Sequence, residues 1–375
     1  MTEAIPIYTD QDFYVPLFEV KLNDLPVGKD VVRDIISVSY SDNISEIDKF
    51  EITINNWDAQ TRDFKYSDKD LFIPGKEVAL WMGYFGKDRL RLMIQGEITS
   101  LRPTFPATGQ STLAISGLNL LHRLRTKQTS HAYLDLKDSE IARQIGQRLN
   151  VKIVTDRKAE AKETPYKYLF QDNQYDIVFL MERARRIGYD LFVEEKGDNG
   201  QAEESQLCFR PSQNVDQPTY QLAYGKSLIE FQPTLTTANQ VAEVTVRGWD
   251  PSRKRKIEHT AKRPQVPTKG LGSEAGRELV EQSFNQRQEI IADRPIESKA
   301  EARQLAEETL QKIVKDMVKG SGSIVGLPDI RAGTVLQIDG LGTRFNGRYF
   351  VTATTHTISD SGYTTRFECR LEELT

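Results

Sequence analysis

Two similar segments lie far apart in the chain, and an internal repeat constrains the fold more than any other sequence feature. Residues 44–58 have the sequence ISEIDKFEITINNWD, and residues 236–250 have TTANQVAEVTVRGWD. Both alternate apolar and polar positions and end in a Trp-Asp pair, Trp57-Asp58 and Trp249-Asp250. Because the chain holds only three tryptophans, the match predicts two β domains of common origin. The alternative is two unrelated β-hairpins that share a Trp-Asp pair.

Weaker matches flank this pair and have a different spacing. Upstream, residues 34–38 resemble 227–231. Downstream, the residues around Gly75 resemble those around Gly333, and 96–99 resemble 347–352. The downstream matches are further apart than the upstream ones. The second copy is therefore expected to carry an insertion after its Trp-Asp strand.

Each copy consists of short alternating runs separated by Gly, Pro, Asn and Asp, which is typical of small antiparallel barrels or sandwiches. In the first copy we expect strands at 18–22, 35–40, 50–55, 77–84, 90–102 and 111–115. In the second copy we expect them at 227–233, 243–247, 334–339, 347–359 and 363–371. A β-propeller is excluded, because its blades would recur every ~40–45 residues.

Elsewhere the apolar spacing becomes helical. Helices are predicted to begin at Asp138 and Asp176, within an α+β module, and after Ser298, which is a good N-cap residue. The last helix is expected to stop at the glycines of residues 320–322. Residues 262–276 are rich in Pro, Gly, Lys and Ser and predict a mobile loop.

The fold class predicted is mainly β with α+β insertions: two related antiparallel β domains plus two smaller domains. The first β domain is assigned to residues 1–122 and the α+β module to 123–215. The second β domain is discontinuous, at 216–259 and 323–375, and the helical and loop insertion occupies 260–322.

Composition excludes several classes of function. A formal net charge of -4, with 28% charged and 38% hydrophobic residues, is that of an ordinary globular chain and argues against coating nucleic acid or anionic membrane. No apolar run is long enough to span a membrane, and no signal peptide is visible, so synthesis in the cytoplasm is expected. The basic cluster Arg253, Lys254, Arg255 and Lys256 is either a solvated hairpin end or a contact for a channel or an acidic partner.

No motif predicts catalysis or a cofactor. The four histidines, at 122, 131, 259 and 356, include no i, i+4 pair, and H-E-x-x-H and G-x-S-x-G are absent. Cys208 and Cys369 are expected to be buried small hydrophobes. We therefore expect a protein that is not an enzyme, without metal or cofactor. A hydrolase that uses two carboxylates remains an alternative.

The C-terminal block resembles the phage late control protein D family. The residues that carry the resemblance are Gly326, Pro328, Gly333, Gly347, Tyr349, His356, Gly362 and Tyr363. Members of that family are baseplate hub proteins of contractile tails, similar to the N-terminal hub part of VgrG spike proteins. The resemblance implies that both β domains are β-barrel tube domains.

The resemblance also implies a function: a homotrimeric baseplate hub that joins the hexameric inner tube to the trimeric spike. Its expected partners are a separate spike protein, the inner tube protein and baseplate wedge proteins, without specific nucleic-acid binding, in a virion tail or tail-like injection particle. A spike on the same chain is not expected, because residue 375 follows closely on the last predicted strand. The alternatives are a cell-wall glycan hydrolase of the tail and a receptor-binding tail protein.

Overall fold

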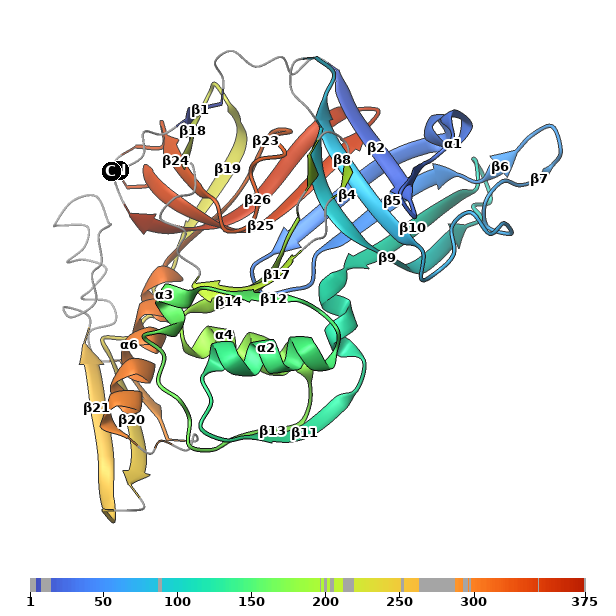
Figure 1. Ribbon diagram of the computed structural model, residues 1–375. Coiled ribbons are helices and arrows are strands. Elements are labelled where there is room, and N and C mark those ends of the chain that lie inside the picture. Colours follow the sequence, from blue (N-terminus) through green and yellow to red (C-terminus); the bar gives the residue numbers. More distant parts are fainter. Residues whose placement is uncertain are drawn as a thin grey trace.

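A single large β-sheet runs through both predicted β domains, and two smaller units lie below it in the view of Figure 1. The computed structural model describes residues 5–7, 15–86, 90–195, 197–198, 201–202, 206–211, 219–250, 253–262, 287–292, 296, 298–342 and 344–373. The predicted mobile loop, apart from Lys262, lies outside the described residues. The mainly β fold class is confirmed. In the described part of the chain, no helix is long and apolar enough to cross a membrane.

The first half of the large sheet contains six main strands that pair antiparallel in the order β2-β8-β9-β10-β5-β4. Their bounds are β2 (Pro16–Leu22), β4 (Ile35–Asn43), β5 (Lys49–Asn55), β8 (Glu77–Tyr84), β9 (Arg91–Thr104) and β10 (Thr112–Asn119). Alternate side chains of β4, β5 and β10 point to one face and are almost fully buried there, so this half has its own core.

The second half contains six strands in the order β18-β24-β25-β26-β23-β19 and encloses a separate core. Their bounds are β18 (Thr219–Ala223), β19 (Leu228–Leu235), β23 (Val318–Val325), β24 (Val335–Asp339), β25 (Gly347–Ser359) and β26 (Gly362–Glu373). The prediction of purely antiparallel sheets is wrong at β18, which runs parallel both to β24 and to the short strand β1. Parallel neighbours need a long crossover, and between β18 and β24 the chain from β19 through α6 to β23 provides it.

The two halves share one strand order, so the repeat is present in the structure, with β4, β5, β8, β9 and β10 corresponding to β19, β23, β24, β25 and β26. The correspondence extends to irregularities. β4 and β19 each skip one residue against their partner strand, Ile36 in one and Ile229 in the other. The amide of Gly75 donates to the carbonyl of Ile98, and Gly333 makes the equivalent bond to Val351, both at 2.8–2.9 Å.

The Trp-Asp match, however, does not belong to this repeat. The strand of the second Trp-Asp pair, β20 (Glu243–Asp250), pairs with β21 (Arg255–Lys262) and β22 (Gln288–Ile291) in a separate three-stranded sheet. The counterpart of β5 is β23 instead. The prediction that the Trp57 and Trp249 strands are equivalent is therefore wrong, and the alternative of unrelated hairpins is right.

Local turn chemistry explains why the two segments look alike. Asp58 Oδ1 accepts a hydrogen bond from the Gln60 amide at 2.8 Å, and Asp250 Oδ1 accepts one from the Arg253 amide at 3.0 Å. An aspartate that caps the turn after a strand is common in hairpins of any origin. Trp249, in turn, is 57% exposed, so no shared core position required it.

The second correction concerns residues 318–322, which the sequence analysis assigned to the insertion. The predicted helix begins after Ser298 as expected but ends earlier, as α6 (Lys299–Lys315), and β23 follows. A Cβ at Gly320 would lie 2.5 Å from the Phe231 ring, and one at Gly322 would lie 2.7 Å from the Phe367 ring. The glycines therefore make room for core aromatics inside a strand and do not mark a loop. Strands β20 and β21 belong with α6 rather than with the second half, because they share one hydrophobic cluster.

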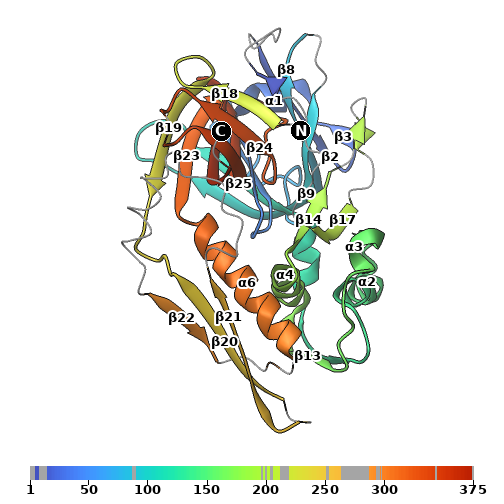
Figure 2. The same ribbon diagram turned by 90° about the vertical axis from the view of Figure 1, so that its left-hand side faces the viewer.

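The α+β module forms the other small unit and has its own core. Its predicted helices are present as α2 (Asp138–Arg148) and α4 (Asp176–Arg186), with η1 (Leu120–Arg125) and α3 (Arg157–Glu160) nearby. Its strands are β11 (Gln128–Tyr133), β12 (Ile153–Thr155), β13 (Leu169–Tyr175), β14 (Tyr189–Glu194), β15 (Gly197–Asp198), β16 (Gln201–Ala202) and β17 (Gln206–Pro211). Short elements elsewhere are β1 (Ile5–Pro6), β3 (Leu25–Pro26), α1 (Lys29–Asp34), β6 (Trp57–Asp58) and β7 (Asp63–Phe64). Figure 2 shows α6 between the β20–β22 sheet and α4.

Candidate functional site

The described residues form no recognisable catalytic centre. Among them, no group of three or more His, Cys, Asp or Glu side chains could hold a metal ion. The histidines lie on separate elements, and His122 has Glu97 as its partner at 3.0 Å. Cys208 and Cys369 form no disulfide and are buried, as predicted. The candidate functional sites among the described residues are therefore surfaces and the junctions between units.

The junction between the two halves is the first such place. Strand β4 pairs antiparallel with the second part of β25, from Asn43 opposite Ala353 to Ser37 opposite Ser359. This ladder joins the halves edge to edge, in the order β9-β10-β5-β4-β25-β26-β23-β19. The halves therefore continue one another as neighbours in a sheet, not as stacked layers.

A buried ion pair, which the sequence analysis missed, fixes this junction. Arg331 Nε of the second half donates to Asp42 Oδ2 of the first half at 3.0 Å. The Arg331 guanidinium also donates to the Met93 carbonyl at 2.8 Å and to the Tyr40 hydroxyl, and it lies over the Tyr40 ring. Asp42 in turn accepts hydrogen bonds from the Thr354 amide and hydroxyl on β25. These bonds satisfy both charges and cross the junction in both directions.

His356 lies beside this pair and is completely buried. Its Nε2 is 3.0 Å from the Ile330 carbonyl, which can only accept, so Nε2 carries the proton. Nδ1 is then the acceptor for the hydroxyls of Tyr363 and Thr365, each at 3.0 Å. Desolvation by burial lowers the pKa of His356 to about 4, so the ring is neutral at pH 7.

The residues that carry the family resemblance prove to be structural and gather largely around this junction. Gly326 accepts a hydrogen bond from the Tyr84 hydroxyl of the first half at 2.9 Å and packs on the Tyr363 ring. Tyr349 lies in the core of the second half, and its hydroxyl donates to the Phe345 carbonyl. The others lie in loops or at strand ends: Pro328 is buried, and Gly333, Gly347 and Gly362 have positive φ.

Gly326→Ala is expected to destabilise the protein by about 1–3 kcal/mol, because a Cβ there would lie 2.0 Å from the buried Tyr363 ring. Urea unfolding measures the loss. Gly28→Ala is the matched control, since nothing lies within 4 Å of its Cβ and its φ is negative. Equal stability of the two variants would contradict close packing at this junction.

Two strand edges equivalent to those of the junction remain open. The second part of β9 corresponds to the part of β25 that pairs with β4, and no described strand pairs with its outer edge. Similarly, β19 corresponds to β4 and pairs only with β23 among the described strands. The open edge of the first half is therefore equivalent to the β25 edge of the junction. The open edge of the second half is equivalent to the β4 edge.

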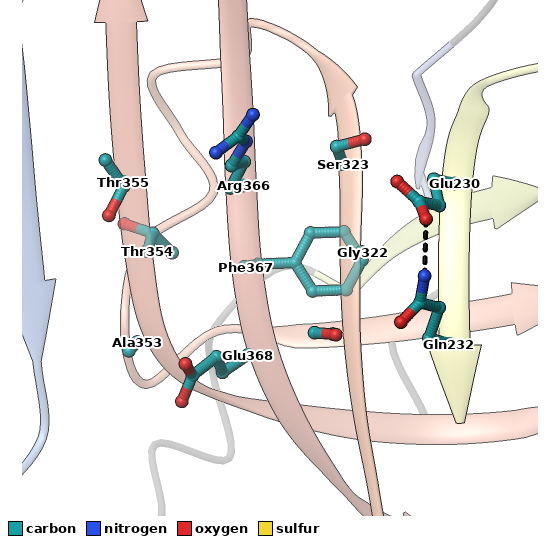
Figure 3. Close-up of a pocket in the computed structure, with 11 residues that line it drawn as sticks. Glu230, Gln232, Gly322, Ser323, Ala353, Thr354, Thr355, Arg366, Phe367 and Glu368 are labelled. Carbon is teal, nitrogen blue, oxygen red and sulfur yellow. Dashed lines mark hydrogen bonds between the residues drawn. The ribbon is translucent and has the colours of Figure 1, made fainter. Parts of the chain in front are cut away.

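The face of the joined sheet that points away from the two cores carries mainly polar side chains, many of them Ser and Thr. Figure 3 shows part of it, a shallow pocket of about 380 Å³ that extends from β25 to β19. The side chains that line it are mainly polar: Glu230, Gln232, Ser321, Ser323, Thr355, Arg366 and Glu368. In the first half the same face carries Ser37, Ser39, Ser41, Glu51, Thr53, Arg102 and Ser116. The basic cluster is not on this face, because it lies at the far turn of the β20–β21 hairpin (Figure 1).

Solved structures of tail proteins share this fold. The 43 kDa tail protein of prophage MuSo2 from Shewanella oneidensis matches with a TM-score of 0.70 at 10% identity, covering 95% of this chain and 98% of that one. A tail protein from Neisseria meningitidis MC58 gives 0.68 at 11% identity, covering 95% and 97%. The E. coli c3393 protein, a component of the type VI secretion system, gives 0.55 at 10% identity, covering 93% and 76%. The chain therefore has the fold of these phage tail and secretion proteins.

The family follows from a sequence match. The family model described as the Alg8 N-terminal domain matches residues 18–360, and the chain belongs to this family. This match does not confirm the late control protein D family that the C-terminal motifs resemble. No curated protein matches the chain.

Proposed function

We propose that the protein is a structural baseplate hub of a contractile phage tail or phage-tail-like injection particle, related to the late control protein D family. The single observation that carries the proposal is the edge-to-edge junction of two halves with the same strand order. The shared fold with prophage tail proteins and a type VI secretion component supports it.

The adaptor role follows from symmetry. Three chains contain six similar halves, and contacts of a head-to-tail kind close into a ring when the rotation between subunits divides the circle. Such a homotrimer presents six similar halves to a hexameric inner tube on one side and a threefold surface to a separate trimeric spike on the other. The polar face of the sheet would line the channel, while the α+β module and the α6 unit would contact wedge proteins outside it.

We further propose that the protein acts without catalysis, because its most deeply buried carboxylates already hold the fold together. Asp42 pairs with Arg331, Asp138 pairs with Arg183, and Asp176 pairs with Arg148. One observation favours the alternative of a glycan hydrolase. Burial raises the pKa of Glu308 to about 7, and this carboxyl lines a groove of about 1960 Å³ between α4, α6 and the second half.

Light scattering on the purified protein, alone and with its spike, tests the adaptor. The expected particle contains three chains, and a stable dimer or tetramer would contradict the proposal. The same preparation is then added to peptidoglycan. Clearing that is abolished by Glu308→Gln would favour the hydrolase instead, whereas the hub proposal expects none.

A further inference from the structure

The two open edges define the contact between neighbouring copies in the ring proposed above, on which this inference rests. We propose that β9 of one protomer lies antiparallel beside β19 of the next, as β25 lies beside β4 within one chain. The occupant of each open edge is thus a second copy of this chain. The internal repeat relates the strands of the contact within one chain to the strands of the contact between chains, and so predicts the register of the second from the first.

The bulges of the two halves fix that register. β9 skips Thr99 against β10, and β25 skips Thr352 against β26, so the residues that follow correspond one to one. β4 and β19 are aligned by their own bulges in the same way. The intrachain pairs are Asp42 opposite Thr354, Tyr40 opposite His356 and Val38 opposite Ile358. Their counterparts between chains are Leu235 opposite Leu101, Pro233 opposite Pro103 and Phe231 opposite Phe105.

The chemistry of the matched positions supports this pairing. At the intrachain junction, Asp42, Thr354 and Tyr40 take part in the polar contacts around Arg331, and only the pair of Val38 and Ile358 is aliphatic. At the open edges all six are apolar. Phe105 is 60% exposed, while Phe231 is half-buried on its own core. Two of the six, Pro103 and Phe105, are exposed and the other four are half-buried. Single apolar residues at a surface are ordinary, but six at matched positions on two edges indicate surfaces that bury each other.

The prolines add a restriction. The amide of Ile44 donates to the Thr352 carbonyl, which marks that pair as hydrogen-bonded, so every second pair after it is also of this kind. Pro103 and Pro233 fall at such a pair, and neither has an amide to donate. The ladder between chains is therefore interrupted at its centre, and apolar contact has to hold it. In a free protomer the same prolines keep both edges from pairing indiscriminately.

The short β6–β7 hairpin, which contains Trp57 and Phe64, packs against Phe105 at the end of β9. Phe105 packs on Phe64 at 5.1 Å between ring centroids, and Phe64 packs on Trp57 at 5.6 Å. The hairpin β6–β7 follows β5, just as the segment with Gly326 and Arg331 follows β23. That segment binds the neighbouring half within the chain, so the hairpin is placed to bind the neighbouring half of the next copy.

A disulfide between chains tests the register. Arg102 and Thr234 are the counterparts of Thr355 and Ser41, whose hydroxyl oxygens are 3.1 Å apart within the chain. The variant Arg102→Cys/Thr234→Cys is therefore expected to form covalent dimers and trimers on a non-reducing gel, because facing residues of a non-hydrogen-bonded pair suit a disulfide. Arg102→Cys/Glu230→Cys, which is out of register on the same face, is expected to stay uncrosslinked. Ser41→Cys/Thr355→Cys should link within one chain and leave the mass unchanged.

The outcomes separate the contact from the ring. A trimer by light scattering without the in-register crosslink overturns the contact and leaves the ring standing. Crosslinks from the out-of-register pair overturn the register, and a dimer or tetramer overturns the ring itself. A monomer with no crosslink at high protein concentration overturns pairing between the edges.

A second variant measures the apolar contact without cysteines. Phe105→Asp is expected to weaken association by about tenfold or more, since it places a charge among buried apolar side chains. Phe85→Asp is the control, because Phe85 is 71% exposed on the β8–β9 turn, away from both edges. Equal association of the two variants, with unchanged melting temperatures, would contradict the proposed interface.

Discussion

Arg331→Met is expected to lower the free energy of unfolding by about 3–5 kcal/mol, because it leaves the buried Asp42 carboxylate without its cation. Asp42 is only 7% exposed, so water cannot replace the guanidinium there. The substitution also removes the hydrogen bond to the Met93 carbonyl and the contact with the Tyr40 ring. Urea unfolding of the two proteins side by side measures the loss.

Two further variants make this test specific. Adding Asp42→Asn to Arg331→Met is expected to restore part of the stability, since an amide can still accept from Thr354 without burying an unpaired charge. Arg303→Met is the control, because Arg303 makes an exposed i, i+4 pair with Glu307 on α6 and should cost less than about 0.5 kcal/mol. A loss at Arg331 as small as that at Arg303 would refute the role assigned to the junction.

The second large effect is a dependence of stability on pH at His356. The unfolded histidine has the ordinary pKa of 6.5, whereas burial lowers the pKa of His356 in the folded protein to about 4. The unfolded chain therefore takes up a proton first as the pH falls. Neutral His356 makes its whole contribution to the free energy of unfolding above pH 6.5. As the pH falls from 6.5 to about 4, the free energy of unfolding decreases by as much as about 3 kcal/mol.

The contribution of His356 is isolated by difference. Urea unfolding is measured from neutral pH to pH 4 for the wild type and for His356→Gln, which does not titrate in this range. Because other groups cancel, the stability difference between the two proteins should shift by about 3 kcal/mol in favour of the variant as the pH falls. Parallel curves for His356→Gln would contradict the account of its burial.

Much of the fold followed from apolar patterning alone. The bounds of β8 and β25 were predicted to the residue, and α2, α4 and α6 begin where their polar N-terminal residues predicted. Strong alternation and helical spacing are local signals, so one sequence suffices to detect them.

The repeat was located correctly at its weak matches and wrongly at its strongest one. The weak matches around Gly75 and Gly333 reflect a shared backbone, because both glycines have a φ near 90° and the same ladder bond follows. Trp57-Asp58 and Trp249-Asp250 reflect turn chemistry, which recurs without common ancestry. Strand β23 was missed because Gly320 and Gly322 predict a loop unless the aromatic rings that occupy their space are known.

The candidate site could be predicted only in part. The motif residues from Gly326 to Tyr363 marked the right region, although they turned out to pack the junction and not to contact a ligand. The ion pair between Asp42 and Arg331 joins residues almost 290 positions apart, and no spacing rule links them. The open edges are likewise a property of strand order, which exists only in the folded chain.

Electron cryo-microscopy of the purified oligomer tests the central claim most directly. The account predicts a threefold ring in which β9 of each chain lies beside β19 of the next. The polar sheet face should line the channel, and α2, α4 and α6 should lie outside it. An assembly of another symmetry, or a channel lined by those helices, would contradict it.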